Sequence, residues 1–250
     1  MSRVRVGAVS YLNTKPLVWG LETAEAFDLR FDVPSRCAAL LHAGETDLGL
    51  IPSIEYLRGP VDYRIAPGLS LASRGAVDSV AIYTPKDLRD VRTVAMDTSS
   101  RTSAALVRVL CARRFGIAPE FVQHAPGLEA MLTACDAALL IGDNALFLDH
   151  AAVEGAVGRP VQKFDLGAEW FALTGLPFVY AFWAGRPGVL DADAVSRLQA
   201  ARDAGLAHVE EIATRDYPGD AVRQATAARY LRDNMKYHLG ADECAGLAQF

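Results

Sequence analysis

Residues 4–17, VRVGAVSYLNTKPL, join an apolar run to a polar turn, and this pairing sets the pattern of the chain. Val4–Val9 predicts a buried strand, because short runs rich in valine and other apolar residues are typical of strands. Ser10–Leu17 then brings hydroxyls, an amide and a proline, but no glycine fingerprint and no obvious general base. Such a turn at the end of a strand raises the question of what its polar groups bind.

Strands and helices alternate through two similar modules, which implies βαβ units and parallel sheets. The first module has expected strands at Val4–Val9, Leu29–Val33 and Asp47–Ile51 and expected helices at Leu17–Ala26, Arg36–Ala43 and Ser53–Leu57. After a strand at Val77–Tyr83, the second has strands at Val91–Met96, Phe121–His124 and Ala137–Ile141 and helices at Ala104–Phe115 and Leu128–Ala134. A strand at Leu176–Trp183 and two helices, Ala192–Ala213 and Asp220–Leu239, close the chain.

The closing strand and helices need a surface to pack on, and we expect them to return to the first module. This gives an α/β protein with a discontinuous first lobe, residues 1–84 and 178–250, and an inserted second lobe, residues 85–177. Two crossing strands, near Val80–Pro85 and Leu176–Val179, would join the lobes around a ligand cleft. That is the two-lobed, type II periplasmic-binding-protein-like architecture, and ligands do bind beyond the carboxyl ends of parallel strands. The alternative is a single large doubly wound sheet.

Composition excludes several classes of function. The chain has 250 residues, 51% of them hydrophobic, and a net charge of −5, so it lacks the basic field of a nucleic-acid binder. No signal peptide is recognisable, and no apolar run reaches the roughly 20 residues that span a bilayer. The four cysteines form no CxxC pair and fit no metal site. We therefore expect a cytoplasmic protein without a metal, a membrane or a nucleic acid as partner.

Familiar catalytic and cofactor motifs are absent. The five histidines form no HxxxH or HExxH pair, and the chain has no GxSxG, P-loop or GxGxxG motif. This argues against nucleoside triphosphates, NAD and flavin, and the expected cofactor is none.

The turn Asp97–Ser103, DTSSRTS, is the most informative one. It carries five hydroxyls where a helix begins, and the first N–H groups of a helix are unpaired at the positive end of its dipole. Hydroxyls and free N–H groups together suit a carboxylate or a phosphate. Arg101 would add a bidentate partner or else lie on the surface. Helix capping is the competing interpretation, although a cap uses only one or two such residues.

Other candidates also follow strands. The Asn13 amide both donates and accepts hydrogen bonds, and Ser79 lies on an expected crossing strand. Ser53 fits an N-cap as well as a ligand contact. Asp143 either caps a helix or accepts from a substrate hydroxyl.

Five segments, in this order, resemble the chorismate dehydratase family: SYLNTKPL, AGETDLGLIPSIEY, DTSSRTSAALVRVL, AALLIGDNAL and DLGAEWFALTGLPFVYAFWA. The resemblance covers Val4 to Ala184. It implies the two-lobed fold and a cytoplasmic enzyme of menaquinone biosynthesis by the futalosine route. It also implies a carbon–oxygen lyase that removes water from chorismate, giving 3-[(1-carboxyvinyl)oxy]benzoate. The two carboxylates of such a substrate call for clusters of hydroxyl and N–H groups, which the polar turns supply.

The resemblance also assigns roles to residues. Asn13 and Ser79 would be catalytic, because they would orient the substrate's enolpyruvyl carboxylate and its C4 hydroxyl. The enolpyruvyl carboxylate would itself remove the C3 proton. Residues expected to bind substrate are Ser10, Tyr11, Ser53, Thr98, Ser99, Ser100, Thr102, Ser103, Gly142 and Asp143. Either carboxylate fits either turn. Two alternatives stand beside this interpretation, a 1,4-dihydroxy-6-naphthoate synthase-like enzyme of the same route and a non-catalytic solute-binding protein.

Overall fold

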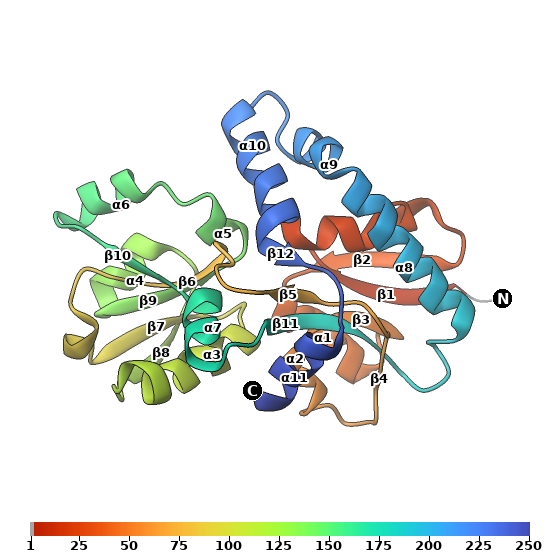
Figure 1. Cartoon of the computed structure of the whole chain (residues 1–250), viewed down its shortest axis with the longest axis horizontal. Helices are drawn as coiled ribbons and strands as arrows, with labels where there is room; N and C mark the ends of the chain where they lie inside the picture. Colours follow the sequence, from red (N-terminus) through yellow and green to blue (C-terminus); the bar gives the residue numbers. More distant parts are fainter. Residues whose placement is uncertain (1–2) are drawn as a thin grey trace.

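The computed structural model describes residues 3–250, and two β-sheets lie side by side in it, each with its own helices (Figure 1). The strands of the first sheet are β1 (Val4–Val9), β2 (Phe27–Asp32), β3 (Leu48–Pro52), β4 (Arg64–Ile65), β5 (Leu71–Ser73), β11 (Phe178–Gly185) and β12 (Met235–Lys236). Those of the second are β6 (Val80–Thr84), β7 (Thr93–Asp97), β8 (Glu120–His124), β9 (Ala137–Ile141) and β10 (Gln162–Asp165). Two separate sheets rule out the single doubly wound sheet.

Helices surround both sheets. The α-helices are α1 (Pro34–Ala43), α2 (Ser53–Tyr56), α3 (Thr102–Leu110), α4 (Leu128–Ala134), α5 (Asp143–Leu146), α6 (His150–Val157), α7 (Leu166–Thr174), α8 (Ala192–Ala207), α9 (Val209–Asp216), α10 (Ala221–Arg229) and α11 (Ala241–Gln249). Short 3₁₀ helices are η1 (Leu12–Val18), η2 (Leu21–Thr23) and η3 (Leu88–Asp90), and π-turns are η4 (Cys111–Phe115) and η5 (Tyr230–Asn234).

The two sheets share one plan, a parallel trio beside an antiparallel strand. In the first sheet β1 pairs in parallel with β2 and β3, and β11 runs antiparallel to β3. In the second, β7 pairs in parallel with β8 and β9, and β6 runs antiparallel to β9. The predicted parallel pairing therefore holds for each trio, whereas each sheet as a whole is mixed. Each antiparallel strand enters its sheet directly after the chain has crossed from the other one.

The outward crossing lies earlier in the chain than the predicted lobe boundary. β5 belongs to the first sheet, whereas Val80–Thr84 pairs with β9 and β10 in the second. A boundary after residue 84 therefore assigns β6 to the wrong lobe. The chain crosses to the second lobe earlier, between Ser73 and Val80. The apolar run Val77–Tyr83 merges the crossing segment with the strand that follows, so the sequence pattern shows no boundary there. The return crossing lies between α7 and β11.

Two predicted helices do not form as single continuous α-helices. The expected helix Leu17–Ala26 is replaced by η1 and η2, which Gly20 separates in the left-handed region at φ 75°. The expected helix Ala192–Ala213 breaks at His208, whose φ of −122° leaves the helical region. The His208 ring stacks on Trp19 at 5.0 Å between centroids, so a tertiary contact holds the residue at the break.

The C-terminal region departs furthest from the prediction. The expected helix Asp220–Leu239 ends as α10 and continues as η5 and the edge strand β12, which pairs with β5. Leu231, Met235 and Leu239 have helical spacing, but the pairing of Met235 with Ser73 overrides it. The helices α6, α7 and α11 and the strands β4, β5, β10 and β12 were not predicted.

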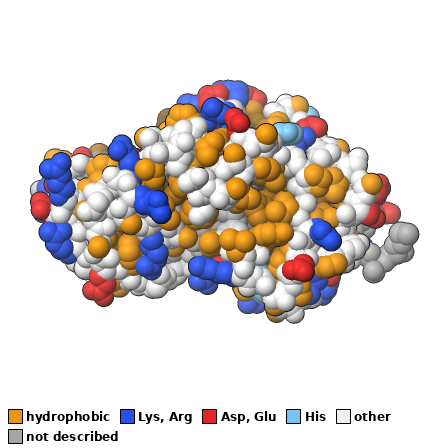
Figure 2. Space-filling model, turned by 60° about the horizontal axis from the view of Figure 1, so that its bottom comes forward, with side chains coloured by type: hydrophobic (Ala, Val, Ile, Leu, Met, Phe, Trp, Pro, Cys, Tyr) orange, Lys and Arg blue, Asp and Glu red, His pale blue; other side chains and the backbone are white. Residues whose placement is uncertain are grey.

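The largest apolar cluster includes Val6 and Trp183 from the first sheet and Met96 and Leu139 from the second, so the lobes are in apolar contact. Figure 2 shows acidic and basic side chains interspersed on one face, without a large patch of one sign. Within residues 3–250, no helix has the length and apolar character to cross a membrane.

Candidate active site between the two lobes

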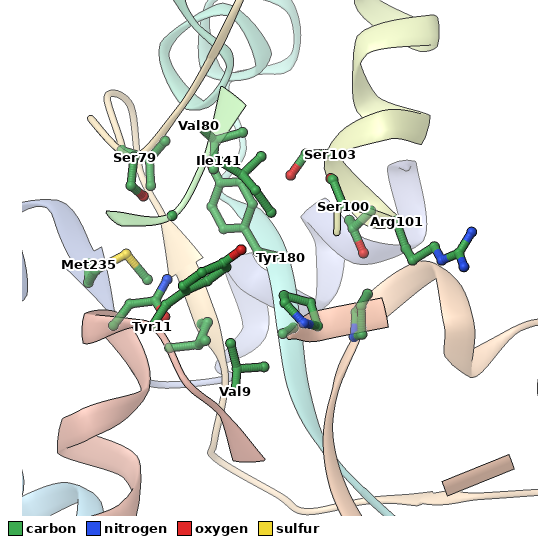
Figure 3. Close-up of a pocket in the computed structure, with 18 residues that line it drawn as sticks. Val9, Tyr11, Ser79, Val80, Ser100, Arg101, Ser103, Ile141, Tyr180 and Met235 are labelled. Carbon is green, nitrogen blue, oxygen red and sulfur yellow. The ribbon is translucent and has the colours of Figure 1, made fainter. Parts of the chain in front are cut away.

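A cavity lies where the carboxyl ends of both parallel trios meet (Figure 3). Its walls come from the turns after β1, β7 and β9, from the outward crossing segment, and from β11 and β12. The lining residues are Val9, Tyr11, Asn13, Pro34, Pro52, Leu71, Val77, Ser79, Val80, Ser100, Arg101, Thr102, Ser103, Ile141, Gly142, Tyr180, Ala181 and Met235. The site thus combines residues from the beginning, the middle and the end of the chain.

Polar groups are concentrated at two ends of the cavity. Figure 3 shows Ser79 on one side and Ser100, Arg101 and Ser103 on the other, with the Tyr11 and Tyr180 side chains between them. Most of the remaining wall is apolar, as is usual for a small-molecule site with a few placed polar groups. The arrangement suits a small ligand with a flat or cyclic middle and polar substituents at both ends.

The end formed by α3 is an anion site by its chemistry. The N–H groups of Thr102, Ser103 and Ala104 have no hydrogen-bond partner within residues 3–250. The Ser100 hydroxyl is buried, lines the cavity and also has no partner. Among residues 3–250, Arg101 is the only charged residue in the lining, and it is exposed to solvent at the rim. Free N–H groups at the positive end of a helix, together with a guanidinium, favour a carboxylate.

The opposite end is a hydrogen-bonded triad. The Asn13 Nδ2 group donates to the Tyr230 hydroxyl at 3.2 Å, and the Ser79 Oγ lies 2.7 Å from the same hydroxyl. Tyr230 is fully buried behind the two lining residues. The turn after β1, the outward crossing and the C-terminal π-turn therefore meet at one oxygen atom.

Direct contacts across the cleft hold the lobes together. The Leu12 N–H donates to the Asp143 carboxylate at 3.1 Å, and the Tyr11 hydroxyl lies 3.1 Å from the Ser99 Oγ. The Ile54 N–H donates to the Thr102 Oγ at 3.3 Å. These contacts join the two lobes on either side of the cavity.

The structure places eight of the residues singled out in the sequence in the cavity wall. They are Tyr11, Asn13, Ser79, Ser100, Arg101, Thr102, Ser103 and Gly142. Tyr180, Met235 and the buried Tyr230 were missed. Tyr180 stands in an apolar strand pattern and the other two in a helical pattern, and neither pattern carries a functional signal.

Five predicted ligand residues lie outside the wall, and we no longer propose direct substrate contact for them. Ser10 and Thr98 are exposed. The Ser53 hydroxyl donates to the Val179 carbonyl at 2.9 Å, and the Ser99 hydroxyl donates to Asp97 at 2.6 Å. The Asp143 carboxylate accepts from Leu12 instead of facing the cavity. Ser53, Ser99 and Asp143 thus act on the protein itself.

Burial raises the pKa of Asp143 to about 6 from its ordinary 3.8, although the Leu12 N–H opposes the shift. Between those values the folded protein holds a proton that the unfolded chain has lost. The contribution of this group to the free energy of unfolding therefore falls as the pH rises from about 4 to about 6 and stays low above that.

We expect Asp143→Asn to remove this decrease in the free energy of unfolding with pH, while the amide keeps an oxygen that accepts from the Leu12 N–H. The free energy of unfolding of the variant relative to the wild type should increase by on the order of 3 kcal/mol between pH 4 and pH 7. Urea unfolding of both proteins across that range measures the difference. A constant difference at all pH values would show that the carboxyl titrates normally.

A protein family described as menaquinone biosynthesis matches residues 4–250. The chain belongs to this family. A chorismate dehydratase from Thermus thermophilus is 33% identical over 259 residues, covering 98% of this chain and 93% of the relative. The family match spans both lobes and every element that lines the cavity.

Solved structures confirm the fold of this menaquinone biosynthesis family member. Protein AF1704 from Archaeoglobus fulgidus superimposes with a TM-score of 0.72 at 16% identity, covering 99% of this chain and 94% of that one. The Candida albicans CA3427 product, described as having the generic periplasmic binding protein fold, gives 0.62 at 11% identity, with coverages of 95% and 82%. The aliphatic sulphonate binding protein SsuA from Escherichia coli gives 0.58 at 17% identity, with coverages of 100% and 90%. The predicted two-lobed, periplasmic-binding-protein-like class is confirmed.

Proposed function

We propose that this protein is a chorismate dehydratase, which removes water from chorismate to give 3-[(1-carboxyvinyl)oxy]benzoate for menaquinone biosynthesis. The observation that carries the proposal is the near full-length similarity to a chorismate dehydratase within a menaquinone biosynthesis family. The cavity supports it independently, because chorismate has a ring in the middle and charged or polar substituents at its ends.

We propose one orientation for the substrate between the two ends of the cavity. The ring carboxylate on C1 lies across the ring from the C4 hydroxyl, and the enolpyruvyl group on C3 is next to that hydroxyl. We place the C1 carboxylate at the α3 N-terminus, against the free N–H groups, the Ser100 hydroxyl and Arg101. The C4 hydroxyl and the enolpyruvyl carboxylate then meet Asn13 and Ser79, and the tyrosine rings flank the substrate ring.

The chemistry needs mainly positioning. The C3 hydrogen is acidic because the C1=C2 bond conjugates it with the ring carboxylate, and losing it with the C4 hydroxyl makes the ring aromatic. Charge that develops on the C1 carboxylate during proton removal is stabilised at the α3 end. Asn13 and Ser79 orient the groups that react at the other end.

The base is the substrate's own enolpyruvyl carboxylate. The described cavity lining contains no Asp, Glu, His or Lys. Burial raises the pKa of Tyr11 and also raises that of Tyr180 well above its ordinary value, which keeps both phenols protonated and so unable to take up a proton. The enolpyruvyl carboxylate is covalently held close to the C3 hydrogen and needs only the right torsion, which the enzyme imposes.

The deciding experiment mixes the purified protein with chorismate, without added metal or cofactor, and follows products by chromatography and mass. We expect an aromatic product lighter than chorismate by one water. Spontaneous rearrangement gives an isomer of unchanged mass and so is distinguished from dehydration. Unchanged chorismate in the presence of folded protein would contradict the proposal and favour a synthase of the same route or a binding protein.

A cytoplasmic location stays a prediction. Cys37, Cys111 and Cys135 are buried free thiols, which suits a reducing compartment. Chorismate as a small dicarboxylate partner and a cofactor-independent hydro-lyase reaction belong to the same proposal.

A further inference from the structure

Tyr230 has no part in the mechanism above, yet its hydroxyl joins the two residues proposed to act on the reacting end of chorismate. Its side chain is 1% exposed, and its hydroxyl forms hydrogen bonds only with Asn13 and Ser79 among residues 3–250. It is the first residue of the π-turn η5, a rare element that often accompanies functional sites.

The directions of these two hydrogen bonds follow from donor counting. The Asn13 Nδ2 group is a donor only, so the Tyr230 oxygen accepts from it. The Asn13 Oδ1 faces the other way and accepts from the Thr14 hydroxyl at 3.5 Å, in agreement with this orientation of the amide. The Tyr230 proton then has one acceptor in reach, the Ser79 Oγ at 2.7 Å. The opposite direction would leave a buried phenol proton without an acceptor, which is costly.

The hydroxyl proton of Ser79 has no acceptor in this network. Because the Ser79 hydroxyl accepts from Tyr230 and forms no other hydrogen bond within residues 3–250, its own O–H is free to point into the cavity that it lines. A serine without this partner donates or accepts according to its surroundings, since its hydroxyl rotates.

We propose that Tyr230 is a positioning residue that fixes Ser79 as a hydrogen-bond donor to the departing C4 hydroxyl of chorismate. This inference rests on the proposed function. A hydrogen bond donated to that oxygen stabilises the negative charge that it gains as the C4–O bond breaks, whereas an acceptor there would oppose the bond breaking. The proton that the enolpyruvyl carboxylate takes from C3 passes to the leaving oxygen and completes the water molecule. Burial raises the pKa of Tyr230, which keeps the phenol protonated for this task.

The test is Tyr230→Phe, with Tyr237→Phe as the matched control. Tyr237 is also buried, at 4% exposed, but its hydroxyl has no hydrogen-bond partner within residues 3–250, so its removal changes packing similarly and breaks no hydrogen bond. For Tyr230→Phe we expect kcat to fall about 10- to 100-fold with KM within about threefold of the wild type, in line with general acid–base effects. For Tyr237→Phe both constants should stay within about twofold.

A double-mutant cycle distinguishes positioning from a structural role. In the Ser79→Ala background Tyr230→Phe should lower kcat by no more than about fivefold, because the hydroxyl that it orients is gone and only its hydrogen bond with Asn13 is still lost. An undiminished further loss in that background, or a wild-type kcat for Tyr230→Phe, would overturn the inference. Either of these results would leave the proposed function intact. The proposed function fails only if the wild type does not dehydrate chorismate.

A fluorinated tyrosine at position 230 serves if Tyr230→Phe does not fold. It keeps the ring and the hydroxyl but ionises at lower pH, and a phenolate cannot donate to Ser79. We expect its kcat to decline toward alkaline pH earlier than that of the wild type, with KM unchanged. Identical pH profiles would contradict the role of the proton.

Discussion

Asn13→Ala and Ser79→Ala should each lower kcat for chorismate dehydration by about 10²–10³-fold, the usual cost of removing one preorganised hydrogen-bonding group from a reaction centre. Both side chains line the cavity, and each is held from behind by the Tyr230 hydroxyl. Their positions are fixed before the substrate arrives, so truncation removes stabilisation that water does not replace with the same geometry. Steady-state kinetics with product detection at saturating chorismate measures the loss.

Matched controls separate catalysis from folding. The Ser70 side chain is also buried, but its hydroxyl donates to the His238 carbonyl at 3.0 Å, and Ser70 does not line the cavity. Asn144 is exposed beside the cleft. Ser70→Ala and Asn144→Ala should keep kcat within about twofold of the wild type, even if the first lowers stability.

The assignment would be wrong if both site variants kept a near-normal kcat. A rise in KM with unchanged kcat would mean that Asn13 and Ser79 bind chorismate equally in the ground state and the transition state. The predicted result is instead a loss that appears in kcat, because the carboxylate must be held in the conformation from which it reaches the C3 hydrogen.

The polar turns were predictable because they follow parallel strands. Tyr11 and Asn13 follow β1, Ser100 and Ser103 follow β7, and Gly142 follows β9. The carboxyl ends of parallel strands meet at one edge of a sheet, and the two lobes turn these edges toward one cleft. Apolar strands and polar turns were therefore enough to place most of one wall of the site.

The rest of the site depends on long-range packing. Tyr180 lies on the return strand β11, and Tyr230 and Met235 follow α10, whose sequence pattern continues as a helix face. Only the pairing of β12 with β5 breaks that helix and brings Tyr230 to Asn13, 217 residues away. Nothing local in the sequence specifies such a contact.

The predicted ligand residues that lie outside the cavity have a common physical explanation. Neighbouring side chains in a turn point in different directions, so a run of hydroxyls cannot all face one ligand. Ser100 lines the cavity, whereas the preceding Ser99 bonds Asp97 and reaches Tyr11 across the cleft. A polar-rich turn thus identifies a site, but the direction of each side chain comes from the fold.

Gly142→Ala should lower kcat/KM by about a hundredfold or more, because displacing a catalytic arrangement by about 1 Å costs that much. Gly142 has φ 64° and ψ −147°, a conformation that side chains rarely adopt. A Cβ there would lie 2.7–2.9 Å from three carbon atoms of the Tyr11 ring, on the opposite lobe. The ring must move, and its link to Ser99 and the neighbouring Leu12–Asp143 bond cannot then form as they do in the closed cleft.

Gly158→Ala distinguishes this clash from backbone strain alone. Gly158 also has a positive φ, 75°, but a Cβ there would meet no atom within 4 Å. We expect Gly158→Ala to lower stability by about 1 kcal/mol, without a comparable loss of kcat/KM. Small-angle scattering should show a larger radius of gyration for Gly142→Ala than for either the control or the wild type, because the lobes stay apart. Equal dimensions with wild-type kcat/KM would mean that the Tyr11 ring adapts, and that close contact between Gly142 and Tyr11 is not required for the cleft to close.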